Sequence, residues 1–152
     1  MKVVLTEAER QLVTTARRAT LGTIGRDGRV RLVPICFVLI DDVMWSPLDE
    51  KPKSVEDVRS LARVRDIEAD PRVTLLVDRW SEDWSELTWV RIDGRATLVD
   101  SDSDVIDALR AKYPQYTAHD LESRPMIRIA IEGVRSWAPS PANADATRRS
   151  VE

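Results

Sequence analysis

The chain has 152 residues, of which 23 are basic and 26 acidic, and its formal net charge is −3 at pH 7. A chain of this length usually forms one domain around one core, and a net negative charge argues against a general nucleic-acid-binding protein, which needs a basic face. Cys36 is the only cysteine and His119 the only histidine. The composition therefore excludes a disulfide framework and a cysteine-based zinc site within one chain, and it disfavours a Ser-His-Asp triad.

Arginine and tryptophan are over-represented. Arginine supplies 19 of the 23 basic residues, and tryptophan supplies five of the eight aromatic residues. Arginine is suited to bidentate binding of carboxylates and phosphates. A GC-rich genome is the simpler explanation of the arginine content, and core packing is the simpler explanation of each tryptophan.

The N-terminal segment has no long apolar run and no cleavage pattern, and no part of the chain approaches the roughly 18 apolar residues of a membrane span. We therefore expect a soluble, cytoplasmic protein.

The first third of the chain predicts one helix and three strands. Thr6 and Glu9 have the spacing of a capping box, and apolar residues follow at helical spacing to about Arg18. Turn residues then separate segments rich in Val, Leu, Ile and Thr. The predicted strands are 19–24, 29–40 and 43–46.

The rest of the chain predicts two helices and three strands. Ser54 begins an amphipathic helix, which should break near Arg63 and resume as a short turn that ends before Pro71. The later helix should be capped by Ser101 or Ser103. The predicted segments are strands 72–78 and 87–99, a helix over 100–113, and a last strand over 126–134 that reaches Trp137. Residues 139–152 show no apolar periodicity, so we expect disorder there.

Antiparallel strands with short links and helices inserted between hairpins predict a mainly β fold. We expect a closed or split barrel of about six strands over residues 1–138, with 139–152 as a disordered tail, rather than a doubly wound parallel sheet. The chain carries neither a P-loop nor a Gly-x-Gly-x-x-Gly motif.

Two segments have the residues of a binding site. Lys51, Lys53 and Arg63 lie beside the predicted helix start at Ser54, which suits a phosphate. A solvated, locally paired helix explains the same charges equally well. The polar loop 78–86 holds Trp80 and Trp84, which could cover a planar ligand, pack against a second subunit or fold back on the barrel.

Several blocks of sequence follow one another in an order and spacing that resemble the pyridoxamine 5′-phosphate oxidase-like proteins, and more narrowly their branch that uses the deazaflavin coenzyme F420. The blocks are 49–53, 61–67 leading to 70–73, Asp78 with 82–84, and 89–96. The likeness covers about residues 6–137.

The resemblance implies a homodimeric split β-barrel with two cofactor sites at the subunit interface. It also implies hydride transfer between reduced F420 and a small electron-poor organic substrate. Arg31, Val33 and Pro34 would line the ring, Ser46 would approach it, and Trp84 would close the site. Lys51, Lys53 and Arg63 would hold the phosphate or the acidic tail, and Trp137 matches an aromatic residue near the family's C-terminus. Asp66 departs from the pattern, because relatives tend to carry an amide there, and an acid beside a polyanion is unfavourable unless Arg63 or Arg65 neutralises it.

Because the cofactor supplies the hydride chemistry, no catalytic side chain is nominated, and no metal, nucleic acid or membrane partner is expected. Two alternatives stay open. One is an FMN-dependent enzyme related to pyridoxamine phosphate oxidase. The other is a non-catalytic protein that binds F420, flavin or haem.

Overall fold

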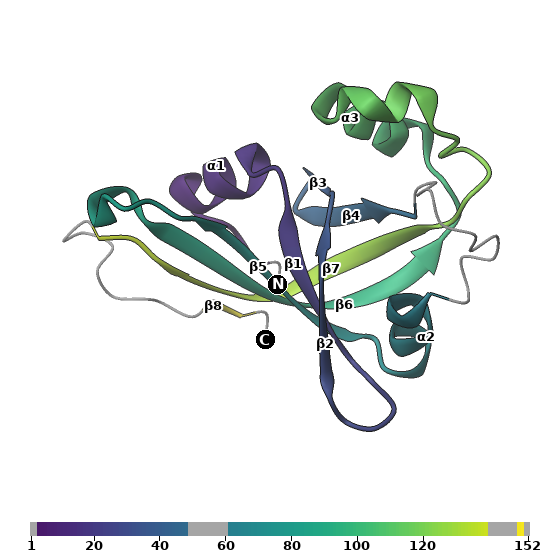
Figure 1. Cartoon of the computed structure of the whole chain (residues 1–152), viewed down its shortest axis with the longest axis horizontal. Coiled ribbons are helices and arrows are strands. Elements are labelled where there is room, and N and C mark those ends of the chain that lie inside the picture. The colour runs from purple at the N-terminus through teal and green to yellow at the C-terminus, as the bar shows by residue number, and fades with distance from the viewer. Residues whose placement is uncertain (1–2, 49–60, 140–148, 151–152) are drawn as a thin grey trace.

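An antiparallel sheet forms the frame of the molecule in the computed structural model, which describes residues 3–48, 61–139 and 149–150 (Figure 1). Its strands follow the order β2-β1-β5-β6-β7-β4-β3, and β8 pairs with β7 outside this path. The strands are β1 (Ala19–Ile24), β2 (Val30–Ile35), β3 (Val38–Ile40), β4 (Val43–Pro47), β5 (Arg72–Arg79), β6 (Thr88–Val99), β7 (Met126–Trp137) and β8 (Arg149–Ser150). The helices are α1 (Glu7–Thr15), α2 (Ala62–Ala69) and α3 (Ser103–Lys112), with short 3₁₀ turns η2 (Trp84–Glu86) and η3 (Pro114–Ala118).

The sheet is curled into a split barrel. β2 and β3 follow each other in the chain but stand at opposite ends of the strand order. The two residues Cys36 and Phe37 alone link them. So short a link is possible only because the sheet curls until its two edges approach each other (Figure 1). The predicted mainly β, antiparallel fold is therefore confirmed.

The predicted strand over 29–40 is wrong in one respect, since the structure divides it into β2 and β3. At the break, the backbone of Phe37 is bonded to side chains rather than to a neighbouring strand. Its N–H donates to the Tyr113 hydroxyl (3.2 Å), and its carbonyl accepts from Lys112 Nζ (3.0 Å). Both partners come from the distant end of α3, so no local pattern marks the break.

The helices differ from prediction at their ends. α1 ends at Thr15 rather than near Arg18, because Ala16 is already extended, with φ −63° and ψ 139°. α2 agrees with the predicted short segment after a break near Arg63, because it begins at Ala62 after an extended Leu61 and ends at Ala69, before Pro71. The start predicted at Ser54 lies outside the described residues. The N-cap of α3 is Asp102 rather than a serine, because its carboxylate accepts from two backbone N–H groups of the first turn.

The predicted tail also differs at one place. Arg149 and Ser150 form β8 and pair with Val134 and Gly133 of β7, so these two residues have regular structure. The other residues of the tail after Pro139 lie outside the described part of the chain.

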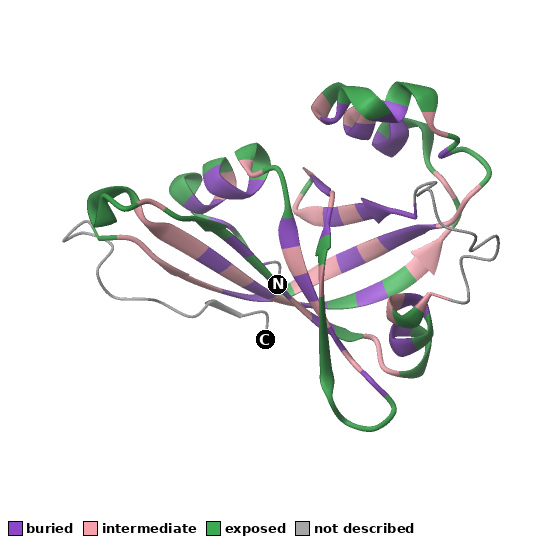
Figure 2. Cartoon of the chain, in the orientation of Figure 1, coloured by how far each residue is buried: buried purple, intermediate pink, exposed green. Residues whose placement is uncertain are grey.

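Two apolar clusters form the core, and both use the inward faces of strands that alternate between buried and less buried positions (Figure 2). The larger cluster joins α1, α2 and the strands of the sheet. The smaller one fixes α3 to β3, through Val105, Ile106 and Leu109 packed near Val38. Within the described residues, no helix is long and apolar enough to span a membrane.

Candidate functional site

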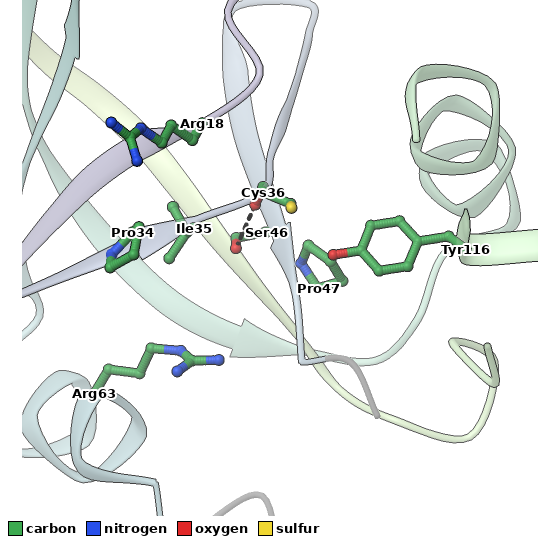
Figure 3. A pocket seen from close by; sticks show the side chains of 8 residues that line it. All are labelled: Arg18, Pro34, Ile35, Cys36, Ser46, Pro47, Arg63 and Tyr116. Atoms are coloured by element: carbon green, nitrogen blue, oxygen red, sulfur yellow. Dashed lines mark hydrogen bonds between the residues drawn. The ribbon is translucent and has the colours of Figure 1, made fainter. Parts of the chain in front are cut away.

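A pocket of about 130 Å³ lies where the end of β2 meets β4 (Figure 3). Segments far apart in the chain build its wall: the link before β1, the end of β2, β4, the first turn of α2, and η3. The lining residues are Arg18, Pro34, Ile35, Cys36, Ser46, Pro47, Arg63 and Tyr116. The fold thus brings together three residues that the resemblance implied for the cofactor, namely Pro34, Ser46 and Arg63.

Ser46 forms part of the wall and also fixes its shape. Its side chain is buried, and its hydroxyl donates to the carbonyl oxygen of Cys36 at 2.8 Å (Figure 3). This bond ties β4 to the link between β2 and β3. Because the hydroxyl proton is used there, Ser46 presents its oxygen to a ligand as an acceptor and a shaping group rather than as a donor.

The charge of the pocket is positive. Arg18 and Arg63 flank it from different elements, and the described residues of its lining include no carboxylate (Figure 3). Guanidinium groups bind phosphates and carboxylates through paired N–H groups. This arrangement suits one anionic group. The sequence predicts Arg18 near the end of the first helix and does not single it out for the site, whereas α1 ends at Thr15 and leaves Arg18 in the link before β1.

Arg31 and Val33 do not line the pocket. Arg31 points to α2, where its Nε lies 3.0 Å from Oδ2 of Asp66. Thr23 donates its hydroxyl to the same oxygen at 2.9 Å. Asp66 is therefore neutralised by Arg31, whereas the sequence suggested Arg63 or Arg65 for that role. Val33 packs against the main core cluster.

The two predicted tryptophans lie at the other end of the molecule. Trp137 pairs with Trp89 at the end of β7, whereas Ser46 pairs with Ile127 near its start. Ten residues of strand, about 30 Å, separate Ile127 from Trp137. Trp84 belongs to η2, in the loop that joins β5 to β6 at the same far end. One chain therefore cannot bring these tryptophans and Ser46 to one small ligand. Lys51 and Lys53 lie outside the described residues.

Lys112 and Tyr113, which the sequence did not single out, pack on Phe37 next to the pocket wall. The Lys112 ammonium lies 3.9 Å from the centre of the Phe37 ring. Burial lowers the pKa of Lys112 to about 8, the charge of Arg17 adds to this effect, and Cys36 opposes it. Burial also raises the pKa of Tyr113, whose hydroxyl bonds to the backbone of Phe37. These contacts hold the link between β2 and β3, which carries Cys36 into the pocket wall.

Among the described residues, no group of three or more His, Cys, Asp or Glu side chains could hold a metal ion. Arg18 and Arg63, together with the apolar and hydroxyl walls, make the pocket at the end of β2 suited to an anion, and we call it the anion pocket.

Comparison with known proteins gives a family and a fold. The family model described as pyridoxamine 5′-phosphate oxidase matches residues 5–138, a range that includes both the pocket and the tryptophan-bearing loop. No curated protein matches the chain.

Solved structures share the fold. The conserved hypothetical protein Rv2991 from Mycobacterium tuberculosis is 25% identical, with a TM-score of 0.70 over 90% of this chain and 87% of that one. A heme-binding protein from Mycobacterium smegmatis is 15% identical, with a TM-score of 0.72 over 97% of this chain and 60% of that one. An F420 reductase is 16% identical, with a TM-score of 0.65 over 86% of this chain and 98% of that one.

Proposed function

Because the chain belongs to the pyridoxamine 5′-phosphate oxidase family, we propose that it binds coenzyme F420 and acts as an oxidoreductase on a small electron-poor organic substrate. The coenzyme supplies the hydride chemistry when it is bound, so the protein needs to bind and orient it and to exclude water. The observation that carries the proposal is the pocket that Arg18 and Arg63 flank from different elements, beside Pro34 and Ser46.

The size of the pocket indicates which part of the coenzyme it takes. Sites that enclose a drug-sized molecule usually measure about 300–1,000 Å³. The pocket measures about 130 Å³, which is room for one compact anionic group and too little for a three-ring system. Arg18 and Arg63 would therefore hold the phosphate or a carboxylate of the tail. The ring would lie outside the pocket, past Pro34 and Ser46.

A second copy of the chain would complete the ring site. Trp84 and Trp137 can reach a ligand at Ser46 only from another subunit, since about 30 Å of β7 separates the two ends within one chain. The outer face of the sheet offers a surface for this contact. Val30 and Leu32 are 68% and 70% exposed beside a hollow of about 560 Å³, and Leu76 borders the same hollow. Monomeric proteins rarely leave such a set uncovered.

FMN is the second candidate cofactor, because a pocket for one phosphate accommodates it as well. FMN carries no oligoglutamate tail, so the length of the tail distinguishes the two. The fold is also shared with a heme-binding protein. Tight binding without turnover would therefore indicate a carrier rather than an enzyme.

The test is a fluorescence titration of the full chain with F420, with a tail-free form that keeps the phosphate, and with FMN. We expect F420 to bind with Kd below about 10 μM, which corresponds to roughly −7 kcal/mol. Arg63→Ala should weaken binding by about 1–3 kcal/mol, the scale of a charge-assisted hydrogen bond. Arg65→Ala is the matched control, since Arg65 is exposed on the same helix and does not line the pocket.

The other possible results of the titration distinguish the alternative functions. FMN binding tighter than F420 binding would assign the pocket to a flavin. Tight F420 binding without reduction of enones or quinones would leave a carrier. Equal affinities for the Arg63 and Arg65 variants would show that the phosphate lies elsewhere.

A further inference from the structure

A third hollow, separate from the pocket between Arg18 and Arg63, lies on the outer face of the sheet where β5 meets β6, and among the described residues it shares only Leu76 with the 560 Å³ hollow. It measures about 420 Å³, within the usual range for small-molecule sites. Its apolar wall consists of Leu76, Trp80, Leu87 and Trp89. We call this hollow the tryptophan groove. None of the residues that line the anion pocket contributes to it.

The two tryptophans present aromatic surface to the groove. Trp80 is 66% exposed, and its indole N–H donates to Glu82 Oε1 at 3.3 Å. Because this bond satisfies the polar atom of the indole within the loop, its ring faces remain for an apolar partner. Trp89 is half-buried on β6. Large aromatic surface left in water favours a planar molecule that would cover it.

The groove also carries positive charge. The Arg91 guanidinium carbon lies 5.9 Å from the centre of the Trp89 ring, and the Arg91 side chain forms no ion pair or hydrogen bond with the described residues. Arg79 is anchored by a bond from its Nε to the carbonyl of Glu86 (3.0 Å). Among the described residues that line the groove, Asp78 is the one acid, so their net charge is +1. A single anionic group would balance it.

We propose that the tryptophan groove binds a planar aromatic or conjugated carboxylate. The apolar body would cover Trp80 and Trp89, and the carboxylate would pair with Arg91 through two parallel N–H groups. In a dimer the groove would serve as the substrate subsite of the neighbouring subunit, and this role rests on the proposed function. The binding of a carboxylate in the groove is independent of the proposed function.

The test is isothermal titration calorimetry of the full chain, without cofactor, against 2-naphthoate and 2-naphthamide. The two probes have the same ring system and differ in charge. We expect 2-naphthoate to bind roughly tenfold more tightly than the amide, as a charge-assisted bidentate contact predicts. Arg91→Gln should remove this preference, and Trp80→Ala should weaken both probes by roughly fivefold or more.

Arg95→Gln is the matched control, because Arg95 is exposed on the same strand, pairs with Glu132 and does not line the groove. Equal affinities for naphthoate and naphthamide, or unchanged affinity in both groove variants, would overturn the proposal. A second copy of the chain could instead fill the groove. In that case the wild-type dimer would not bind naphthoate, and the Trp80→Ala variant would dissociate in sedimentation velocity; this result would also overturn the proposal.

The proposed F420 binding and the proposed carboxylate binding in the groove can be refuted independently. A chain that binds naphthoate but not F420 would retain the groove and lose the proposed function. A chain that binds F420 but not naphthoate would lose the groove alone.

Discussion

Arg31 and Asp66 form an ion pair between β2 and α2, with Arg31 Nε 3.0 Å from Asp66 Oδ2. The Asp66 side chain is 6% exposed and the Arg31 side chain 52% exposed. A buried carboxylate needs such partners, because an unpaired one would be strongly destabilising. The charge of Arg31 is therefore committed to holding α2, and α2 in turn carries Arg63 to the pocket.

Asp66→Ala should lower the free energy of unfolding by about 1–3 kcal/mol, because the buried Thr23 hydroxyl loses its acceptor. Asp66→Asn should cost less, since the amide oxygen can still accept from Thr23. Urea unfolding measures both values. Asp70→Ala is the control, because its pair with Arg72 is exposed and should contribute little. A cost for Asp66→Ala no greater than that control would refute a structural role for the pair.

Lys112 should make stability depend on pH. Its pKa is about 8 in the folded chain against an ordinary value of 10.5. Between these values the unfolded chain binds the proton more tightly, so the free energy of unfolding should rise with pH. Because the side chain is only half-buried, we expect a rise on the order of 1 kcal/mol between pH 7.5 and 9.5.

The comparison is urea unfolding of wild type and Lys112→Met across this range. Subtracting the two curves removes the groups that both proteins share, and the window ends before Tyr113 titrates, since its pKa is raised. Parallel curves for the two proteins would contradict the assignment.

Gly94 should tolerate no side chain. It follows the register shift at Asp93, and a Cβ there would lie 2.5 Å from the carbonyl oxygen of Ala130. This neighbour is backbone and cannot rotate away, so Gly94→Ala should cost about 2–3 kcal/mol in thermal or urea unfolding. Gly28→Ala is the control, because its turn has φ +81° and open space, and we expect about 1 kcal/mol there. A smaller loss at Gly94 than at Gly28 would show that β6 and β7 can separate locally.

Local signals predicted local structure. The capping box at Thr6 and Glu9 is present with both reciprocal bonds, because its partners lie three residues apart. The break between β2 and β3 was not predictable in the same way. It depends on Lys112 and Tyr113, about 75 residues further along the chain.

The candidate site shows the same division. Pro34, Ser46 and Arg63 meet in one pocket because the curl of the sheet brings the end of β2 to β4, which stands near the opposite end of the strand order, and because α2 lies beside them. Arg31 faces away from that pocket because the buried charge of Asp66 attracts it, and only the packing of α2 on β1 and β2 reveals this.

Trp84 should complete the site from the partner subunit, and subunit exchange tests this. If the partner's Trp84 completes the site at Arg63, then Arg63→Ala and Trp84→Ala should each weaken F420 binding, and mixing the two variants should restore it. After complete subunit exchange at equal amounts, half of the dimers are mixed and each has one intact site, so about a quarter of all sites should bind tightly. Titration of the mixture by fluorescence counts them. Trp84 is 71% exposed, so its replacement should leave the fold intact.

The matched control mixes Arg63→Ala with Arg18→Ala. Both residues line the same pocket of one chain, so each subunit of a mixed dimer keeps one defective pocket and no tight site should return. Recovery in the first mixture alone would place the pocket and Trp84 on different subunits of each site. No recovery in either mixture would contradict a site shared between subunits. Since the length of β7 keeps Trp84 from the pocket of its own chain, Trp84 would then not belong to the site.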